Sequence, residues 1–388
     1  MNVLQKEIGE DMKKKSFRHW LPACLIILAV LLNVIARLSH PLSNWYVNHI
    51  FPLWVATYGR VTGLFPFSVG EWMLYLAVLL TAAAVLLSIF RFLFRRRLSA
   101  AIKLFYKRYM FFLDWVLGVV CLVMTLNCFL LYQVSGISQR FRIGEGQNEE
   151  YGIAELAALR DYVVEQANSL ASVMERDEQG YIIYEGDMKE EARRQMHRLG
   201  EKIPNLKGYY PRPKEFALSG FYSQQYIMGY YFPFSMEANY NKQMYITNKP
   251  FTMCHELSHL KGFILEDEAN FIGYLACVDS QDPLFRYSAY LSVIGYLNRD
   301  FRKAMGEDEQ AYLSHPQISA QVKVDSQFLT PEAWEQVERS AILDTQTVSQ
   351  AADVFLNTTL TLNGVEDGTV SYSRVVGLLL QYYDGILY

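Results

Sequence analysis

The residues with the clearest chemical potential are two histidines and a glutamate in the run His255-Glu256-Leu257-Ser258-His259. On a helix, side chains four positions apart leave the same face, so both imidazoles can bind one Zn²⁺ at about 2.0–2.1 Å. Glu256 follows the first histidine, where it can reach a water held by the metal rather than the metal itself. The HExxH pattern therefore predicts a zinc site with Glu256 as general base, and a solvated surface helix is the competing interpretation.

Neighbouring residues favour the metal site over a surface helix. The segment carries the apolar side chains of a core helix: Phe251, Met253, Leu257 and Leu260. Bare polar side chains on a buried helix need partners. Gly262 is a natural helix stop that can turn the chain back, and a carboxylate follows at Glu266 or Glu268. This run can therefore supply the three protein ligands that a catalytic zinc site requires.

The run Glu266–Asn270 (EDEAN) resembles the E-x-x-A-D/N helix of the gluzincin metallopeptidases, whose first glutamate binds zinc. The resemblance implies that Glu266 is the third ligand and that Asn270 braces the site through hydrogen bonds. Many members of that clan have Asp where this chain has Asn. The short interval from His259 to Glu266 is similar to the metzincin run HExxHxxGxxH, in which a glycine turns the chain toward a third ligand. Glu268 stays the alternative ligand, and we favour Glu266.

Three runs together resemble one bacterial family. They are Pro66–Glu71 (PFSVGE), Pro233–Asn239 (PFSMEAN) and the long stretch His255–Cys277. They look like the family catalogued as domain of unknown function 3810, a set regarded as membrane-anchored metallopeptidases. The resemblance extends from the first hydrophobic segment to the Tyr372-Ser373-Arg374 region. It brings no known substrate, so it supports the architecture more than the biology.

The first third of the chain has the composition of a membrane anchor. Three uncharged runs, 20–36, 72–90 and 115–134, are about long enough to cross a roughly 30 Å hydrocarbon core as helices. The first could be a signal peptide, but no A-x-A-like cleavage site follows it and two further spans do, so we expect an uncleaved anchor. We therefore predict an anchor over residues 1–135 and an extracytoplasmic domain over residues 136–388.

Basic residues set the expected orientation in the membrane. They gather before the first span and between the second and third, at Lys6, Lys13, Lys14, Lys15, Arg18, Arg91, Arg95, Arg96, Arg97, Lys103, Lys107 and Arg108. The positive-inside rule then puts the N-terminus in the cytoplasm and, after an odd number of spans, the rest of the chain outside a bacterial cytoplasmic membrane. The basic residues flank the apolar runs, so membrane topology explains them better than nucleic-acid binding does. We therefore expect membrane lipid and no nucleic acid as partners.

The connector 39–71 between the first two spans is rich in aromatic residues, among them Trp45, Trp54 and Phe67. Such residues suggest helices that lie in the outer membrane interface and form a floor under the catalytic domain. Packing against the spans would explain the same aromatics. Of the five cysteines only Cys254 and Cys277 follow the spans, too few for a disulfide-stapled scaffold.

The remaining residues predict a helix-rich α+β domain, zincin-like by its resemblance to the gluzincins. Helical patterns cover 155–174, 189–199, 287–302, 330–356 and 372–386, and strands are expected within 225–246. In the gluzincin clan an edge strand before the HExxH helix pairs with an extended substrate, and Tyr230–Tyr245 is placed to do this or to form a purely structural hairpin. An electrophile that stabilises the oxyanion is also needed, and Tyr372 and Arg374 are the best candidates.

These features favour a membrane-anchored zinc metallopeptidase that hydrolyses peptide bonds of a peptide or protein substrate in the cell envelope. The same residues would suit a zinc amidase acting on cell-wall peptides. A third possibility is a non-enzymatic sensor or assembly factor with a structural zinc site, although Glu256 has no purpose there. An intramembrane protease is disfavoured because HExxH lies outside every apolar run. The sequence does not determine the substrate or the oligomeric state.

The orientation can be tested with reporter fusions to the full anchor. A reporter that needs export should be active when it is fused after Gln139, and a reporter that works only in the cytoplasm should be active near Arg97, because the charge bias orients the spans. The reverse pattern of reporter activities would contradict both the orientation and the envelope location.

Overall fold

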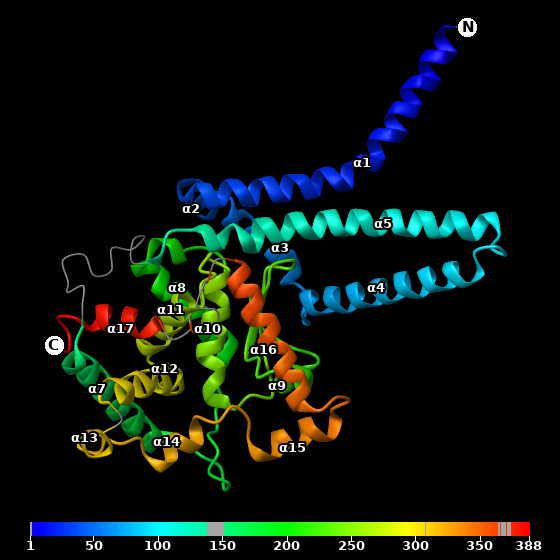
Figure 1. Ribbon diagram of the computed structural model, residues 1–388. Coiled ribbons are helices and arrows are strands. Elements are labelled where there is room, and N and C mark those ends of the chain that lie inside the picture. The colour runs from blue at the N-terminus through cyan, green and yellow to red at the C-terminus, as the bar shows by residue number, and fades with distance from the viewer. Residues whose placement is uncertain (1, 138–150, 307, 364, 366–369, 371–373) are drawn as a thin grey trace. The chain divides into compact units, whose positions relative to one another are not determined.

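The protein is described by a computed structural model of residues 1–388, of which residues 1, 138–150, 307, 364, 366–369 and 371–373 are not described (Figure 1). The chain forms two compact units. The first contains residues 1–44 and 69–134, and the second contains residues 45–68 and 135–388.

The first unit contains three helices that are long and apolar enough to cross a membrane. Their apolar parts are Trp20–Leu38, Val69–Phe94 and Ala100–Gln133. They belong to α1 (Asn2–Leu38), α4 (Val69–Phe94) and α5 (Ala100–Met124), the last continued by the π-helix η1 (Thr125–Phe129) and the 3₁₀-helix η2 (Leu131–Gln133). Each predicted span therefore coincides with a helix long and apolar enough to cross a membrane, and the third helix begins 15 residues before the predicted start of its span at residue 115.

Close backbone approach and a polar contact join α1 to α5. A Cβ at Gly118 would lie 2.9 Å from the Pro22 carbonyl oxygen, so only glycine allows the two helices to come this close. Asn33 Nδ2 of α1 donates to Thr125 Oγ1 at 2.8 Å. Small residues and interhelical hydrogen bonds are the usual means by which helices associate in lipid, where apolar side chains gain nothing by leaving water.

The second unit is helix-rich with one small sheet. Its first elements are the end of α2 (His40–His49) and the helix α3 (Phe51–Thr62). The others, in chain order, are α7 (Ile153–Val173), α8 (Met188–Lys202), η3 (Pro204–Leu206), β1 (Lys214–Glu215), α9 (Ser219–Gln224), β2 (Gly229–Phe232), β3 (Glu237–Tyr240), η4 (Ile246–Asn248), α10 (Lys249–His259), α11 (Glu266–Val278), α12 (Pro283–Ala304), α13 (Glu309–Leu313), α14 (Ala320–Asp325), α15 (Pro331–Ser340), α16 (Thr345–Leu362) and α17 (Val375–Tyr383).

Most predicted helices of this unit form where the sequence pattern places them. The expected single helix over 330–356 is instead two helices, α15 and α16. The break has a local cause, because the Asp344 side chain accepts a hydrogen bond from the Thr347 backbone N–H at 2.9 Å and so caps a new helix. Figure 1 shows α12 lying along α7, and these two helices with α11 and α10 make the helical core.

The sheet has three strands in the order β1-β3-β2. β3 lies in the centre, parallel to β1 and antiparallel to β2, with Gly229 opposite Tyr240 and Phe232 opposite Glu237. β2 is therefore an edge strand, and the hairpin falls inside the segment predicted to form strands. α10 packs against both β2 and β3, so the sheet supports the helix that carries the HExxH motif.

The connector between the first two spans is part of the second unit. The sequence analysis placed residues 45–68 with the anchor, but Thr62 Oγ1 donates to the Ser235 carbonyl at 2.7 Å. The buried Lys214 ammonium also donates to the carbonyls of Thr62 and Phe67, at 2.8 and 2.9 Å, and pairs with Glu237. One cation thus ties the connector to the sheet.

We expect Lys214→Met to destabilise the full-length protein by about 3–5 kcal/mol, because it leaves the Glu237 carboxylate buried without its cation. Thermal unfolding in detergent would measure the change. The double variant Lys214→Met with Glu237→Gln is the matched control, since it removes the orphaned charge. A single variant no less stable than this double variant would contradict the argument.

Candidate metal centre

α10 brings the two motif histidines together as the helical spacing predicts. The ring centroids of His255 and His259 are 4.8 Å apart, with the planes nearly perpendicular. The possible ligand atoms of His255, Glu256 and His259 all lie within 4.8 Å of one another. All three residues are buried, so the motif lies on a core helix and the surface-helix interpretation is wrong.

A tight turn after α10 returns the chain toward the histidines. Gly262 has a φ of +82°, the left-handed conformation expected of a glycine helix stop. A Cβ there would also lie 2.6 Å from Val47 Cγ1, so the site excludes any larger residue. Lys261 fixes the turn from the other side, because its ammonium donates to the carbonyls of Lys207 and Tyr209 at 3.1 and 2.9 Å.

The turn leads into α11, whose first residue is Glu266. Glu266 Oε2 lies 3.1 Å from His255 Nε2, so the structure brings this carboxylate to the first of the two histidines. Close helix crossing makes the contact possible: a Cβ at Gly273 would lie 3.1 Å from the Phe251 ring and 3.3 Å from the His255 backbone nitrogen.

Glu268 has a different partner. Its Oε1 accepts a hydrogen bond from the Ile137 backbone N–H at 2.6 Å, and the side chain is buried. This oxygen therefore fixes the position of Ile137, near the start of the segment that follows the third apolar helix. The geometry favours Glu266 over Glu268 as the carboxylate available to a metal.

The hydrogen bond of His259 fixes the form of its ring. Nδ1 lies 2.6 Å from the Phe263 carbonyl oxygen. A carbonyl can only accept, so Nδ1 carries the proton and Nε2 keeps its lone pair. This arrangement is the usual one for a metal-binding histidine, whose second nitrogen donates to a carbonyl or carboxylate.

Burial and mutual charge shift the pKa values of the cluster in different directions. Burial, with the nearby His255, lowers the pKa of His259 to about 4, so its imidazole is neutral at pH 7. Burial lowers the pKa of His255 as well, but the hydrogen bond to Glu266 and the charges of Glu256 and Glu266 outweigh it and raise that pKa. The Asn270 amide adds to this effect, as a neighbour of the ring. Burial raises the pKa of Glu256 to about 8.

Two polar atoms of the cluster are buried without a hydrogen bond of acceptable geometry: His255 Nδ1 and Glu256 Oε2. An unpartnered buried polar atom costs roughly 1–3 kcal/mol, and in native structures it often marks a site for an ion or water. The donor set of two imidazoles and one or two carboxylates suits a divalent transition metal such as zinc. Either Glu266 or Glu256 can complete such a set with the two histidines.

The two residues expected to stabilise an oxyanion have different outcomes. Tyr372 lies outside the described residues. Arg374 Nε lies 3.4 Å from Asp267 Oδ2. Asp267 belongs to the first turn of α11 and directly follows Glu266. The guanidinium therefore reaches the first turn of α11 through its ion pair with Asp267.

The sequence analysis missed the importance of Gly229 in the edge strand β2. A Cβ at this position would lie 2.4 Å from Glu256 Oε1 and 2.7 Å from Thr252 Cγ2. The backbone of β2 therefore passes directly over the proposed general base. A glycine inside a strand often marks such a close approach, and this was the available signal.

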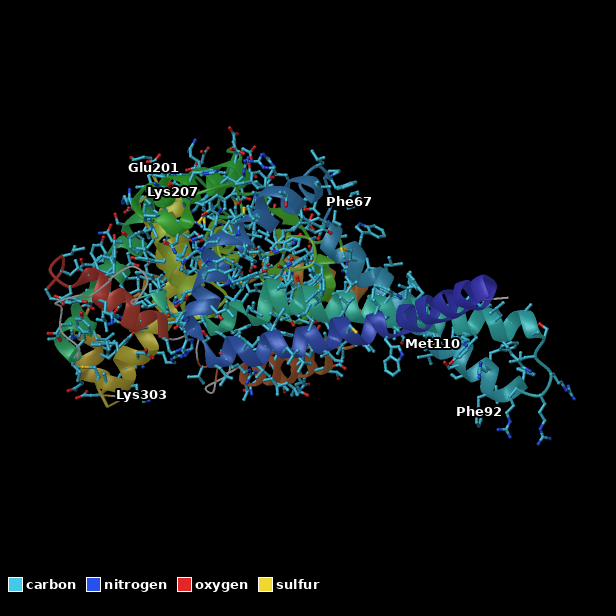
Figure 2. The ribbon with its side chains drawn as sticks, turned by 90° about the horizontal axis from the view of Figure 1, so that it is seen from above. Phe67, Phe92, Met110, Glu201, Lys207 and Lys303 are labelled. Atoms are coloured by element: carbon cyan, nitrogen blue, oxygen red, sulfur yellow. The ribbon has the colours of Figure 1, made fainter. Side chains whose placement is uncertain are left out.

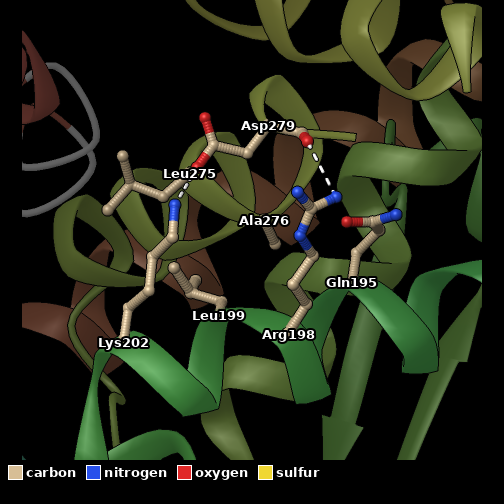
Figure 3. A pocket seen from close by; sticks show the side chains of 7 residues that line it. All are labelled: Gln195, Arg198, Leu199, Lys202, Leu275, Ala276 and Asp279. Atoms are coloured by element: carbon tan, nitrogen blue, oxygen red, sulfur yellow. Dashed lines mark hydrogen bonds and ion pairs between the residues drawn. The ribbon is translucent and has the colours of Figure 1, made fainter. Parts of the chain in front are cut away.

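Two other features are structural. A crevice of about 10 Å³ between α8 and α11, room for about one water, is bordered by an ion pair from Lys202 to Asp279 at 2.5 Å (Figure 3). Arg198 closes it by donating to the Asp279 carbonyl at 3.3 Å. His315 pairs with Asp161, with Nδ1 2.7 Å from Asp161 Oδ2.

A family model matches most of the chain. The family described as "Protein of unknown function (DUF3810)" matches residues 46–380, which include most of the connector between the first two apolar helices and the whole candidate metal centre. No curated protein and no solved structure matches the chain. The match covers most of the sequence and confirms the resemblance seen in its motifs. The chain belongs to the DUF3810 family.

Proposed function

We propose that this protein is a membrane-anchored zinc metallopeptidase. The observation that carries the proposal is the buried group of His255, Glu256 and His259, with the partly buried Glu266 in contact with His255. A structural zinc site needs only ligands, whereas a hydrolytic site needs a base next to an open ligand position. A buried glutamate with one unpartnered oxygen meets that second need.

The residues fit a zinc ion. Two atoms bound to one ion at about 2.0–2.1 Å with tetrahedral angles lie about 3.3 Å apart. His255 Nε2 and Glu266 Oε2 are 3.1 Å apart, close to that value. His259 offers the lone pair of Nε2, since Nδ1 donates to Phe263. The low pKa of His259 keeps it in the neutral form that binds metals.

Each residue of the cluster then has a role in amide hydrolysis. When bound, Zn²⁺ polarises the scissile carbonyl and lowers the pKa of water toward about 7. Glu256 accepts a proton from the attacking water and passes it to the leaving amine. The pKa of about 8 applies to the cluster without a cation, and a nearby positive charge lowers it, so Glu256 becomes a base near neutral pH.

The edge strand β2 supports a peptide as the substrate. An extended peptide can add to an exposed sheet edge through main-chain hydrogen bonds. Gly229 at the start of β2 would touch Glu256 if it carried a Cβ, so a peptide paired with β2 runs beside the base. Tyr230 on this strand is 46% exposed.

The charge distribution supports a location outside the cytoplasm for the second unit. Basic residues lie between the second and third spans, and the connector 45–68 carries Arg60 as its one Lys or Arg. By the positive-inside rule this asymmetry puts the connector, and with it the metal centre, on the outer side.

The first test concerns the ligands. Purified full-length protein should contain about one zinc per chain, and Glu266→Gln should lower zinc affinity by more than the roughly 10–100-fold typical of residues outside the ligand set. Glu268→Gln is the matched control, because its amide oxygen can still accept from Ile137. Metal analysis that finds full zinc in Glu266→Gln and none in Glu268→Gln would assign Glu268 as the ligand instead.

The second test concerns Glu256. Glu256→Gln keeps the shape of the side chain but removes proton transfer, so zinc content should stay and peptide hydrolysis should fall by about 10²–10⁴-fold. Glu335→Gln, at a side chain that is 63% exposed, should keep full activity. If the zinc-loaded wild-type protein is no faster than Glu256→Gln on broad peptide and cell-wall-fragment libraries, the site is structural or regulatory. Activity on wall fragments alone would favour the amidase.

A further inference from the structure

The connector Trp45–Ser68 has one face packed on the second unit. Along α3 the buried positions recur at Phe51, Val55, Gly59 and Thr62, the spacing of one helix face. A Cβ at Gly59 would lie 3.3 Å from Met236 Cβ, so this face sits close against the β2–β3 turn.

The opposite face is also apolar, although it is exposed. Its large side chains and their exposed fractions are Trp45 51%, Leu53 57%, Trp54 41%, Tyr58 38%, Val61 55%, Leu64 82%, Phe65 45% and Phe67 45%; Phe67 is labelled in Figure 2. Arg60 is the only Asp, Glu, Lys or Arg in residues 45–68. An apolar patch of this extent on a protein surface marks contact with a partner or a membrane.

The covalent path of the chain indicates which partner covers this face. The apolar part of α1 ends at Leu38 and that of α4 begins at Val69, so residues 39–68 are attached at both ends to membrane spans. Tryptophan and tyrosine prefer the headgroup level of a bilayer, and an apolar helix face can lie in that layer. We propose that the exposed face of Trp45–Ser68 lies in the headgroup and upper acyl region of the same membrane, as a lipid-contacting floor of the second unit.

The position of this floor has a consequence for the substrate, which rests on the proposed function. Val47 of the connector meets Gly262, in the turn that joins the histidine helix to Glu266. A helix with its side chains is about 10 Å wide, so the metal-site turn is held about one helix diameter from the lipid. The inferred substrate class is a peptide segment near the bilayer surface, such as the juxtamembrane part of a membrane-attached protein.

Spin labels in the full-length chain can test the lipid contact. The five native cysteines are replaced by alanine, a nitroxide is placed at Leu53 or Val61, and one chain is incorporated per lipid nanodisc. We expect the ratio of oxygen to nickel-chelate collision rates to lie between two controls. Ile342, 97% exposed on the second unit, represents water, and Leu79, 66% exposed near the middle of α4, represents the hydrocarbon.

A ratio at Leu53 and Val61 equal to that at Ile342 would overturn the proposal, because the face would be aqueous. Low collision rates with both reagents would also overturn it, because protein would then cover the face. Quenching by brominated lipids gives an independent measurement on nearly native protein. Trp54→Phe should reduce the quenched fraction of tryptophan fluorescence, whereas Trp334→Phe, which removes a ring packed on Phe328, should increase it.

These measurements need neither zinc nor activity. If the face of Trp45–Ser68 contacts lipid but the protein hydrolyses no peptide, the lipid contact is supported and the peptidase proposal is refuted. If the face is aqueous but Glu256→Gln loses activity, the peptidase proposal is supported and the lipid contact is refuted. For the substrate class, a peptide tethered to nanodisc lipid should be cleaved faster than the same peptide free in solution, and equal rates would reject the membrane-proximal substrate.

Discussion

The burial of several ionisable side chains where α10 crosses α11 is the constraint on which the second unit depends. Removing charged groups from water costs several kcal/mol for each ion unless good partners replace the water. The partners come from close approach: Gly273 lets the two helices touch, and the left-handed Gly262 returns the chain within contact distance of His255. The sheet, α8 and α12 surround this crossing and exclude solvent from it. The burial of the neighbouring apolar side chains supplies the favourable free energy that offsets the cost of excluding water from the polar cluster.

Within the cluster, three acidic residues close together in sequence or space have separate functions because of what each contacts. Glu266 meets an imidazole, Glu268 receives a backbone N–H from Ile137, and Glu256 keeps an unpartnered oxygen under the edge strand. Composition alone could not separate them, since all are buried or nearly so. Their contacts distinguish the three carboxylates, and the proposed function gives ion binding to Glu266 and proton transfer to Glu256, while Glu268 has a structural contact.

Sequence reasoning was sound where the information is local. The spacing of His255 and His259, the helix stop at Gly262 and the lengths of the apolar runs all follow from the periodicity of a helix, and the structure has these features. It failed where the determining contact joins distant residues. The closeness of Gly229 to Glu256 depends on how a strand lies over a helix, and the pairing of Lys214 with Glu237 depends on the fold of the whole sheet. The split of the predicted 330–356 helix shows the intermediate case, in which one capping residue, Asp344, overrides a continuous pattern.

The hydrogen bond from Thr62 to Ser235 determines the order in which parts of the second unit can fold during synthesis. Its two residues are separated by 173 positions, and two membrane spans lie between them. At the roughly 5–20 residues per second of synthesis, the connector waits about 9–35 s after it emerges before its partner strand turn exists. During that time its packing face is bare, and the second unit can be completed only after both intervening apolar helices have been synthesised. The fold around the His255–His259 cluster therefore closes late, and a chain that ends before Ser235 leaves the connector without its partner.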